Sequence, residues 1–563
     1  MVHLVDNGHR PICLHFYRDL DSYKEVGRMN SQFLPIPEIT ASMAISSSIG
    51  IAVLLGVSIL LGFIAKKQWT SFDEYLVGKR DMGPVVTGCA LSASYLSGWA
   101  FCGSTGIVYT VGFSGMWFAG MWSLIGVIPC IWVASRKTRE FAVKLNAATV
   151  PELMGRRYES KGVQTVVSFS MLFFLFIYSV GQLKAAGGVW YAVTGFPPAL
   201  CLFLGVFIAW IYMVLGGYVG TNWSMAFQGG FLGIVGMIVG IVALVKSGGF
   251  SEISNQIMAQ DPQLLALVRP DLPSTGPTEF FSSWVGLASI PLIFFTMALG
   301  FPHNLGRFLG MKKMSKKEFW ILVAIVWAIT GLPVMFAAST NGLITRILFG
   351  PELFKIEPWK ADLAAPLLTY AIGGIPLQTL YVMGLFAATL STLAGMVMIM
   401  SANVTRDIIT LWYPKVKDKT LIRLSYFLIA LFLFLPFYWT WKRPPELLSV
   451  FMGLAAMGLG AIFFFVTAIS YYWKGASKWG AITTVVYGTL ASLVGGYLVF
   501  SKKVIGMGTM EWILLGGCFV LFVGVSKITK KPSSKLIAEL FPAPRNKADA
   551  QANNADESGS IAA

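Results

Sequence analysis

The chain has 563 residues, of which 55% are hydrophobic and only 12% are charged. Soluble domains carry about 25% charged residues, so these charges are too few to coat a soluble body of this size. The net charge of +16 fits basic loops at a membrane surface better than a nucleic-acid interface.

Apolar runs of the length that crosses a bilayer, about 20 residues, follow one another along the chain. They predict a polytopic, all-α membrane protein. About thirteen spans are expected, at residues 44–65, 84–110, 113–135, 162–183, 197–218, 225–246, 281–303, 319–346, 376–404, 420–441, 446–473, 478–500 and 510–528.

Lysine and arginine are unevenly shared between alternate loops. With the N-terminus outside, the inner loops and the C-terminal tail hold roughly twice as many of them as the outer loops, and the positive-inside rule then places the C-terminus inside. Residues 1–43 are a polar segment in which Met29 or Met43 offers an alternative start. Residues 44–528 form one membrane domain, and residues 529–563 are expected to be a disordered cytoplasmic tail.

Some function classes find no support in the sequence. There is no GxxxxGK[ST] motif of an ATP-driven pump. The six cysteines lack a CxxC spacing and mostly lie in spans, so we expect them to pack rather than to bind metal. The spans contain no nucleophile–base pair, which makes a membrane enzyme with catalytic residues the least favoured class.

Two spans carry helix-breaking residues. The span at 84–110 contains Gly98, and the span at 281–303 contains Gly300 and Pro302. Proline removes an N–H donor and clashes with the preceding turn, and glycine weakens a helix. Interrupted helices at corresponding positions five spans apart are typical of inverted-repeat transporters, whose sites form at the breaks. A simple kink in each helix remains the alternative.

Sodium requires a cage of oxygens, which neutral carbonyls and hydroxyls can supply. Carbonyls around Ala93 and Leu96 are available at the first break, and Ser391 and Thr392 provide adjacent hydroxyls among small residues. The alternative is that these hydroxyls bond only to carbonyls of their own helix.

The acidic residues separate sodium coupling from proton coupling. All 27 Asp and Glu fall in predicted loops, tails or first turns, and His303 is the only histidine within a span. A proton-driven carrier normally needs a titratable group in the membrane. The sequence therefore favours sodium as the coupling ion.

Several motifs, taken in order, resemble the sodium/solute symporter family over residues 44–528. They are residues 72–83, Ser97-Gly98-Trp99, Gly216-Gly217-Tyr218, Gly300-Phe301-Pro302-His303, Ser391-Thr392 and Thr405-Arg406-Asp407. The resemblance implies thirteen helices, a LeuT-like five-plus-five inverted repeat over spans 2–11, and alternating access. Within the family the chain looks most similar to the sodium/pantothenate and sodium/proline branches.

The resemblance also implies site residues. The sodium site would comprise Ala93, Leu96, Ala388, Ser391 and Thr392. The solute pocket would comprise Ser97, Tyr178, Phe294 and Ala298, of which the last two stand where the proline branch has aromatic residues. Two positions depart from relatives that carry acids there: Tyr95 and Met225.

These observations predict a secondary active transporter that couples sodium to the uptake of a small organic solute. The expected solute is a carboxylate such as pantothenate or proline, met by half-helix N-termini and hydroxyls because no midplane Lys or Arg is expected. Sodium is the only expected ion and there is no other cofactor; the expected location is the cell membrane, the inner one in a bacterium. A uniporter or exchanger without tight sodium coupling, and a non-transporting membrane sensor of the same fold, remain alternatives.

Overall fold

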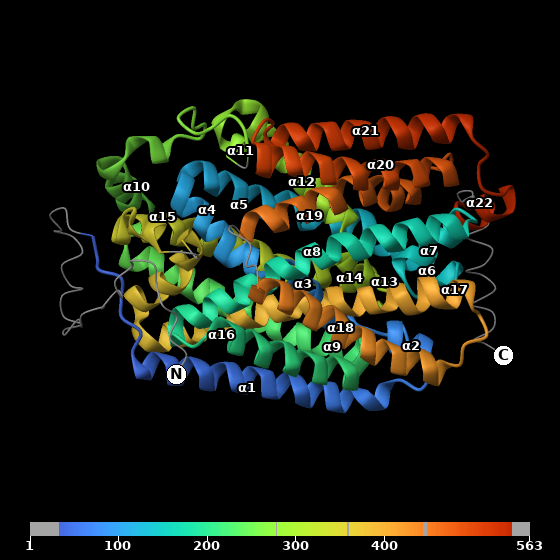
Figure 1. The fold of residues 1–563 in the computed structure, drawn as a ribbon, viewed down its shortest axis with the longest axis horizontal. Coiled ribbons are helices and arrows are strands. Elements are labelled where there is room, and N and C mark those ends of the chain that lie inside the picture. The colour runs from blue at the N-terminus through green and yellow to red at the C-terminus, as the bar shows by residue number, and fades with distance from the viewer. Residues whose placement is uncertain (1–32, 277, 357–359, 443–447, 543–563) are drawn as a thin grey trace, which may run out of the picture.

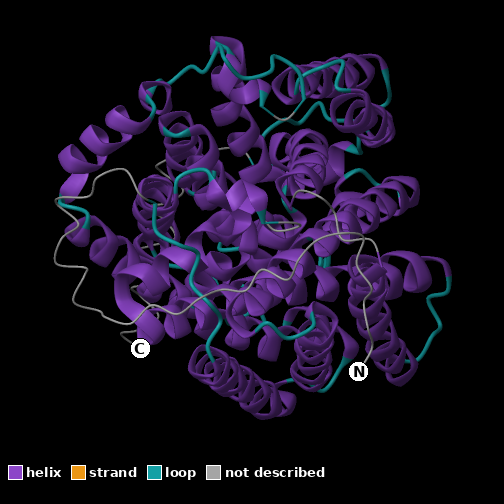
Figure 2. Ribbon diagram, turned by 60° about the vertical axis from the view of Figure 1, so that its left-hand side comes forward, coloured by secondary structure: helices purple, strands orange, loops and turns teal. Residues whose placement is uncertain are grey.

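The computed structural model describes residues 33–542, except 277, 357–359 and 443–447. The described residues are almost entirely helical and form no β-strand, only two isolated bridges (Figure 2). The expectations for residues 1–32 and 543–563 lie outside the described part of the chain.

The α-helices of the described chain run side by side for most of their length (Figure 1). They are α1 (Ala41–Ala65), α2 (Phe72–Val77), α3 (Pro84–Tyr95), α4 (Ser104–Val111), α5 (Phe113–Ile125), α6 (Arg136–Lys144), α7 (Val150–Arg157), α8 (Lys161–Thr194), α9 (Pro198–Lys246), α10 (Gly249–Gln260), α11 (Glu279–Ser282), α12 (Trp284–Gly300), α13 (Pro302–Leu309), α14 (Lys316–Val326), α15 (Ser339–Phe349), α16 (Ala364–Ala402), α17 (Thr410–Trp412), α18 (Asp418–Lys442), α19 (Leu448–Phe463), α20 (Lys478–Gly496), α21 (Met507–Ile528) and α22 (Ser534–Leu540).

Polar side chains begin several of these helices by accepting a hydrogen bond from an otherwise unpaired backbone N–H. Oγ1 of Thr40 accepts from the backbone N of Met43 at 3.2 Å at the start of α1. Ser315 and Glu318 form a reciprocal capping box at the start of α14, with distances of 3.2 and 2.9 Å. The apolar runs between such caps have no other stable state in a bilayer, because helix formation satisfies their backbone internally.

Eleven helices within the described ranges are long and apolar enough to cross a membrane, or twelve if the bent pair Pro84–Tyr95 and Ala100–Val111 forms one span. The 49 residues of α9 would extend about 74 Å as one straight helix, more than twice the thickness of the hydrocarbon core. Its Gly217 has φ 54° and ψ −145°, a backbone conformation that ends a helix. We therefore assign two spans to α9, which accounts for the thirteen predicted spans and confirms the all-α membrane fold.

The helices differ in how much they face lipid. The segment built on α16 is almost wholly buried, whereas α1 and α18 expose apolar side chains along one side. In Figure 1, α1 lies along one edge of the bundle and α21 along the opposite edge. The broken helices α3–α4 and α12–α13 lie between these edges, so that their interruptions are shielded from lipid.

The tail differs from the expected disorder as far as the structure describes it. Residues 534–540 form α22, capped by Ser533 and packed against α6. The ring of Phe541 contacts that of Phe141 at a centroid distance of 5.7 Å, and Lys144 donates to the carbonyl of Glu539 at 3.1 Å. A few apolar residues are enough to pack this segment against α6. The prediction of disorder rested on the overall polar composition of the tail, to which these few residues contribute little.

Candidate ion and solute site

The first helix break lies between α3 and α4. Leu96 has φ −76° and ψ 81°, and the chain continues as a π-helical turn, Trp99–Gly103, before α4. The two halves meet at 57°. Gly98 is required at the break, because a Cβ there would lie 2.5 Å from Cβ of Ala185 and 2.6 Å from Cγ2 of Thr389.

The second break lies between α12 and α13. Phe301 is extended, with φ −66° and ψ 116°, and Pro302 occupies the first position of α13, where its missing N–H costs nothing. Gly300 lies against the backbone of α19: a Cβ would be 2.7 Å from the carbonyl oxygen of Leu459. Each break thus joins a change of backbone direction to a close helix contact that only glycine permits.

Four oxygens from two helices converge beside the first break. Oγ of Ser391 lies 3.0 Å from the carbonyl oxygen of Ala388 and 3.3 Å from that of Ala93. Oγ1 of Thr392 lies 3.0 and 3.1 Å from the same two carbonyl oxygens. All four residues are buried. Of the residues expected at a sodium site, only Leu96 has no contact with this group among the described hydrogen bonds; it is buried in the break itself.

The two hydroxyls carry one proton each, whereas the two carbonyl oxygens together offer four lone pairs. The hydroxyls therefore leave acceptor capacity unused at a buried position between α3 and α16. Each hydroxyl contacts a carbonyl oxygen of its own helix, at Ala388, and one of the neighbouring helix, at Ala93. The structure therefore contains both the bond within α16 and the contact between helices that the sequence left as alternatives. Only the contact with Ala93 requires α3 to end beside these hydroxyls.

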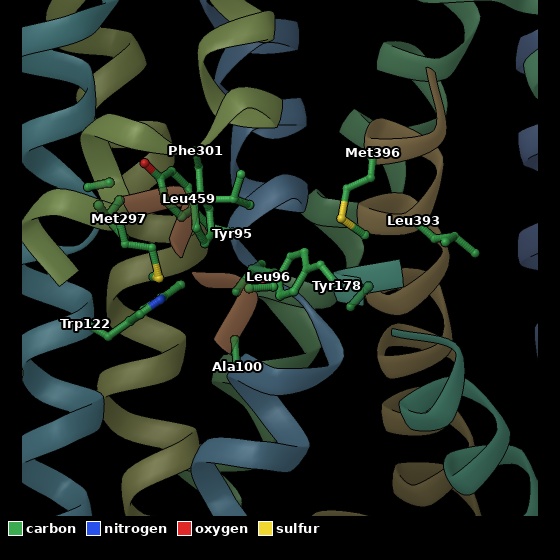
Figure 3. Packing of buried hydrophobic residues seen from close by; sticks show 14 of the residues in the cluster. Tyr95, Leu96, Ala100, Trp122, Tyr178, Met297, Phe301, Leu393, Met396 and Leu459 are labelled. Atoms are coloured by element: carbon green, nitrogen blue, oxygen red, sulfur yellow. The ribbon is translucent and has the colours of Figure 1, made fainter. Parts of the chain in front are cut away.

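A cavity of about 50 Å³ lies on the other side of the first break. Of the four residues expected in the solute pocket, Ser97, Tyr178 and Phe294 line it, while Ala298 is buried but does not. Figure 3 shows Leu96 of the break and Tyr178 close together in the middle of the packed core. A space of this volume admits a few water molecules, so an organic solute enters only if the surrounding helices move apart.

Other residues of this cavity were not predicted from the sequence. Trp122 and Met297 line it, and the ring of Tyr95 meets that of Trp122 edge to face at 5.9 Å (Figure 3). Apolar side chains that face a cavity have the same sequence pattern as those that pack in a core, so no signal marks them. At Tyr95 the sequence indicates only a departure from the acid that the family resemblance implies.

Charged side chains are buried among the membrane helices, and the sequence analysis did not predict their burial. Asp407 lies in the π-helical turn that follows α16, and Glu511 lies near the start of α21; both are completely buried. Lys184 and Arg307 are also buried. The predicted span ended at residue 183 and so left out Lys184, because α8 continues to Thr194.

Hydrogen bonds and ion pairs stabilise most of these charges. Asp407 accepts from Oγ1 of Thr149 at 2.6 Å and from the side chain of Gln164 at 2.9 Å. Lys184 lies 3.9 Å from a carboxylate oxygen of Asp362. A buried charge with such partners can be structural, so these residues do not by themselves indicate proton coupling.

Comparisons with known proteins match most of this chain and its fold. The model of the sodium:solute symporter family matches residues 75–488. A sodium/proline symporter of Staphylococcus aureus is 26% identical over 494 residues, which cover 85% of this chain and 92% of the relative; that of strain JH9 matches at the same identity and coverage over 495 residues. A solved structure of a Na+-coupled sialic acid symporter, in a substrate-bound outward-open state, superposes with a TM-score of 0.67 at 18% identity, covering 87% of this chain and 99% of that one.

Proposed function

Because the chain belongs to the sodium:solute symporter family, and so is a sodium-coupled membrane transporter and not an enzyme, we propose that it carries a small carboxylate. We further propose that sodium is bound by the carbonyl oxygens of Ala93, Leu96 and Ala388 together with the hydroxyls of Ser391 and Thr392. The observation that carries the ion site is the convergence of four oxygens from α3 and α16.

Neutral oxygens suit sodium at this position. Sodium has a single charge, and a cage of carbonyls and hydroxyls replaces its hydration shell without a buried carboxylate, as selectivity filters do for another monovalent cation. The break at Leu96 frees carbonyl groups that a continuous helix would use internally. The same cage joins α3 to α16, so ion binding favours one arrangement of these two helices.

The solute would occupy the cavity on the other side of the break. Its carboxylate would be met by the hydroxyls of Ser97 and Tyr178 and by backbone N–H groups at the break, and its apolar part by Phe294 and Trp122. A small and mainly apolar cavity favours a compact carboxylate, and the relatives named sodium/proline symporters make proline the first candidate. Pantothenate, which is longer, is the second.

The test is accumulation of labelled L-proline and labelled pantothenate by the purified protein in proteoliposomes under an inward sodium gradient. We expect one of the two to accumulate above its outside concentration, and Ser97→Ala to raise its half-saturation constant with little change in the maximal rate. If neither of these solutes, nor any other small carboxylate tested, is accumulated, the proposed solute class is wrong.

Exchange without tight sodium coupling is a second candidate, favoured by one feature of this chain. At Tyr95 and Met225, the two positions where the family resemblance implies an acid, the side chains are buried and cannot supply a carboxylate to a cation. Counterflow of labelled solute in the absence of sodium distinguishes the two functions. A sodium-coupled symporter exchanges slowly under that condition, whereas an exchanger retains its full rate.

A further inference from the structure

The guanidinium of Arg307 is buried without a compensating charge. Arg307 lies in α13, just beyond the second break, and is only 4% exposed. Its Nε donates to Oγ of Ser94 at 3.3 Å and its Nη1 to Oδ1 of Asn222 at 2.9 Å, both neutral acceptors, while Nη2 has no hydrogen-bond partner. None of the ion pairs between described residues includes it.

Arg307 lines a cavity of about 40 Å³ together with other unpartnered polar groups. Both ring nitrogens of His303 and both amide atoms of Asn403 lack a partner, although each residue is at most 1% exposed. The rings of His303 and Tyr178 stack at 5.9 Å, so this cavity is separated from the solute cavity by two side chains. Burying a cation and several donors without partners is unfavourable, unless a ligand supplies the missing charge and acceptors.

The side chain of Met225 meets the guanidinium of Arg307. A Cβ built on Gly395 would collide with Nη2 of Arg307 and would lie 3.4 Å from Cε of Met225, so these two side chains meet at the same point. The side chain that meets the guanidinium here is apolar, so it supplies none of the negative charge that the described ion pairs also leave missing.

We propose that Arg307, His303 and Asn403 form a binding site for a small monovalent anion, either chloride or the carboxylate group of a solute. The size of the cavity limits the ligand to a single ion or a short acid. Gly395 follows Ser391 by one helical turn, about 6 Å along α16, so the site adjoins the oxygens assigned to sodium. In this respect the inference rests on the proposed function: an anion beside Arg307 would offset the repulsion between the guanidinium and a bound sodium ion.

Anion binding can be measured without transport, on the purified protein in a buffer that contains neither sodium nor solute. Potassium gluconate is the reference salt, because its polyol chain is too large for the cavity. We expect potassium chloride at the same ionic strength to raise the melting temperature (Tm) saturably, by a few degrees. A parallel series with potassium acetate tests whether the ligand is a carboxylate. A rise of the Tm with acetate and none with chloride assigns the site to a carboxylate.

Three variants locate the response. Arg307→Gln is expected to lose it. Met225→Glu brings a carboxylate to the guanidinium, so we expect it to raise the Tm in gluconate and to abolish the effect of added anions, even if Arg307→Gln does not fold. Arg80→Gln is the matched control, since Arg80 donates to the backbone carbonyls of Leu309 and Ala147 and does not line the cavity; it should keep the response of the parent.

Two results would overturn the proposal. One is a parent protein whose Tm responds to neither chloride nor acetate. The other is a response that persists unchanged in Arg307→Gln or in Met225→Glu. Neither depends on sodium, so a failure of the anion site is distinguishable from a failure of the proposed sodium site.

Discussion

At the scale of single residues, the hydroxyl of Thr392 distinguishes a sodium ligand from a helix contact. Thr392→Val keeps the shape of the side chain and removes one oxygen. Losing a bond to a charged partner costs about 1.5–3 kcal/mol, and each 1.4 kcal/mol is tenfold in affinity, so the apparent sodium constant should rise roughly ten- to hundredfold. Saturating sodium should restore most of the uptake, because the fold is unchanged.

Thr389→Val is the matched control. Thr389 is on the same helix and equally buried, but its hydroxyl donates only to the carbonyl oxygen of Phe386 in its own helix, at 2.8 Å. We expect its sodium constant to equal that of the parent in a sodium titration of uptake. If Thr392→Val also matches the parent, its hydroxyl is bonded within α16 and the proposed site is wrong.

Among the secondary-structure elements, the proposed site requires the break between α3 and α4 to keep its close contact with α8. Gly98→Ala would place a methyl group 2.5 Å from Cβ of Ala185, with no flexible side chain to yield. We expect at least a tenfold loss in the maximal rate of uptake, the cost of misplacing site groups by about 1 Å. Gly120→Ala on α5, where a Cβ meets nothing within 4 Å, should leave both rate and membrane insertion unchanged.

The breaks could be predicted from the sequence because glycine and proline leave a local signal within an apolar run. Gly98 and Pro302 are such signals. The adjacent hydroxyls of Ser391 and Thr392 are another, because the residue types alone identify them, without knowledge of the tertiary structure. The cavity lining at Trp122 and the buried guanidinium of Arg307 could not be predicted in this way. Their roles depend on which face of a helix meets which neighbour, and that is decided by packing between segments far apart in the chain.

For the molecule as a whole, an odd number of spans predicts that the two ends of the chain lie on opposite sides of the membrane. The basic loops predict that the C-terminal side, where α22 packs on α6, is cytoplasmic. We therefore expect a reporter that works only in the cytoplasm to be active when it is fused after Ala563. Activity of a reporter that works only outside the cytoplasm would require a different number of spans or the reverse orientation.

In the proposed function a sodium gradient drives uptake, and the buried carboxylates Asp407 and Glu511 make the proton the coupling ion to be excluded. The most direct measurement is solute accumulation in proteoliposomes under two separate gradients of equal driving force: inward sodium at constant pH, and inward protons with sodium absent. We expect accumulation under the sodium gradient and only passive equilibration under the proton gradient. Accumulation at full rate under the proton gradient, without sodium, would contradict this expectation.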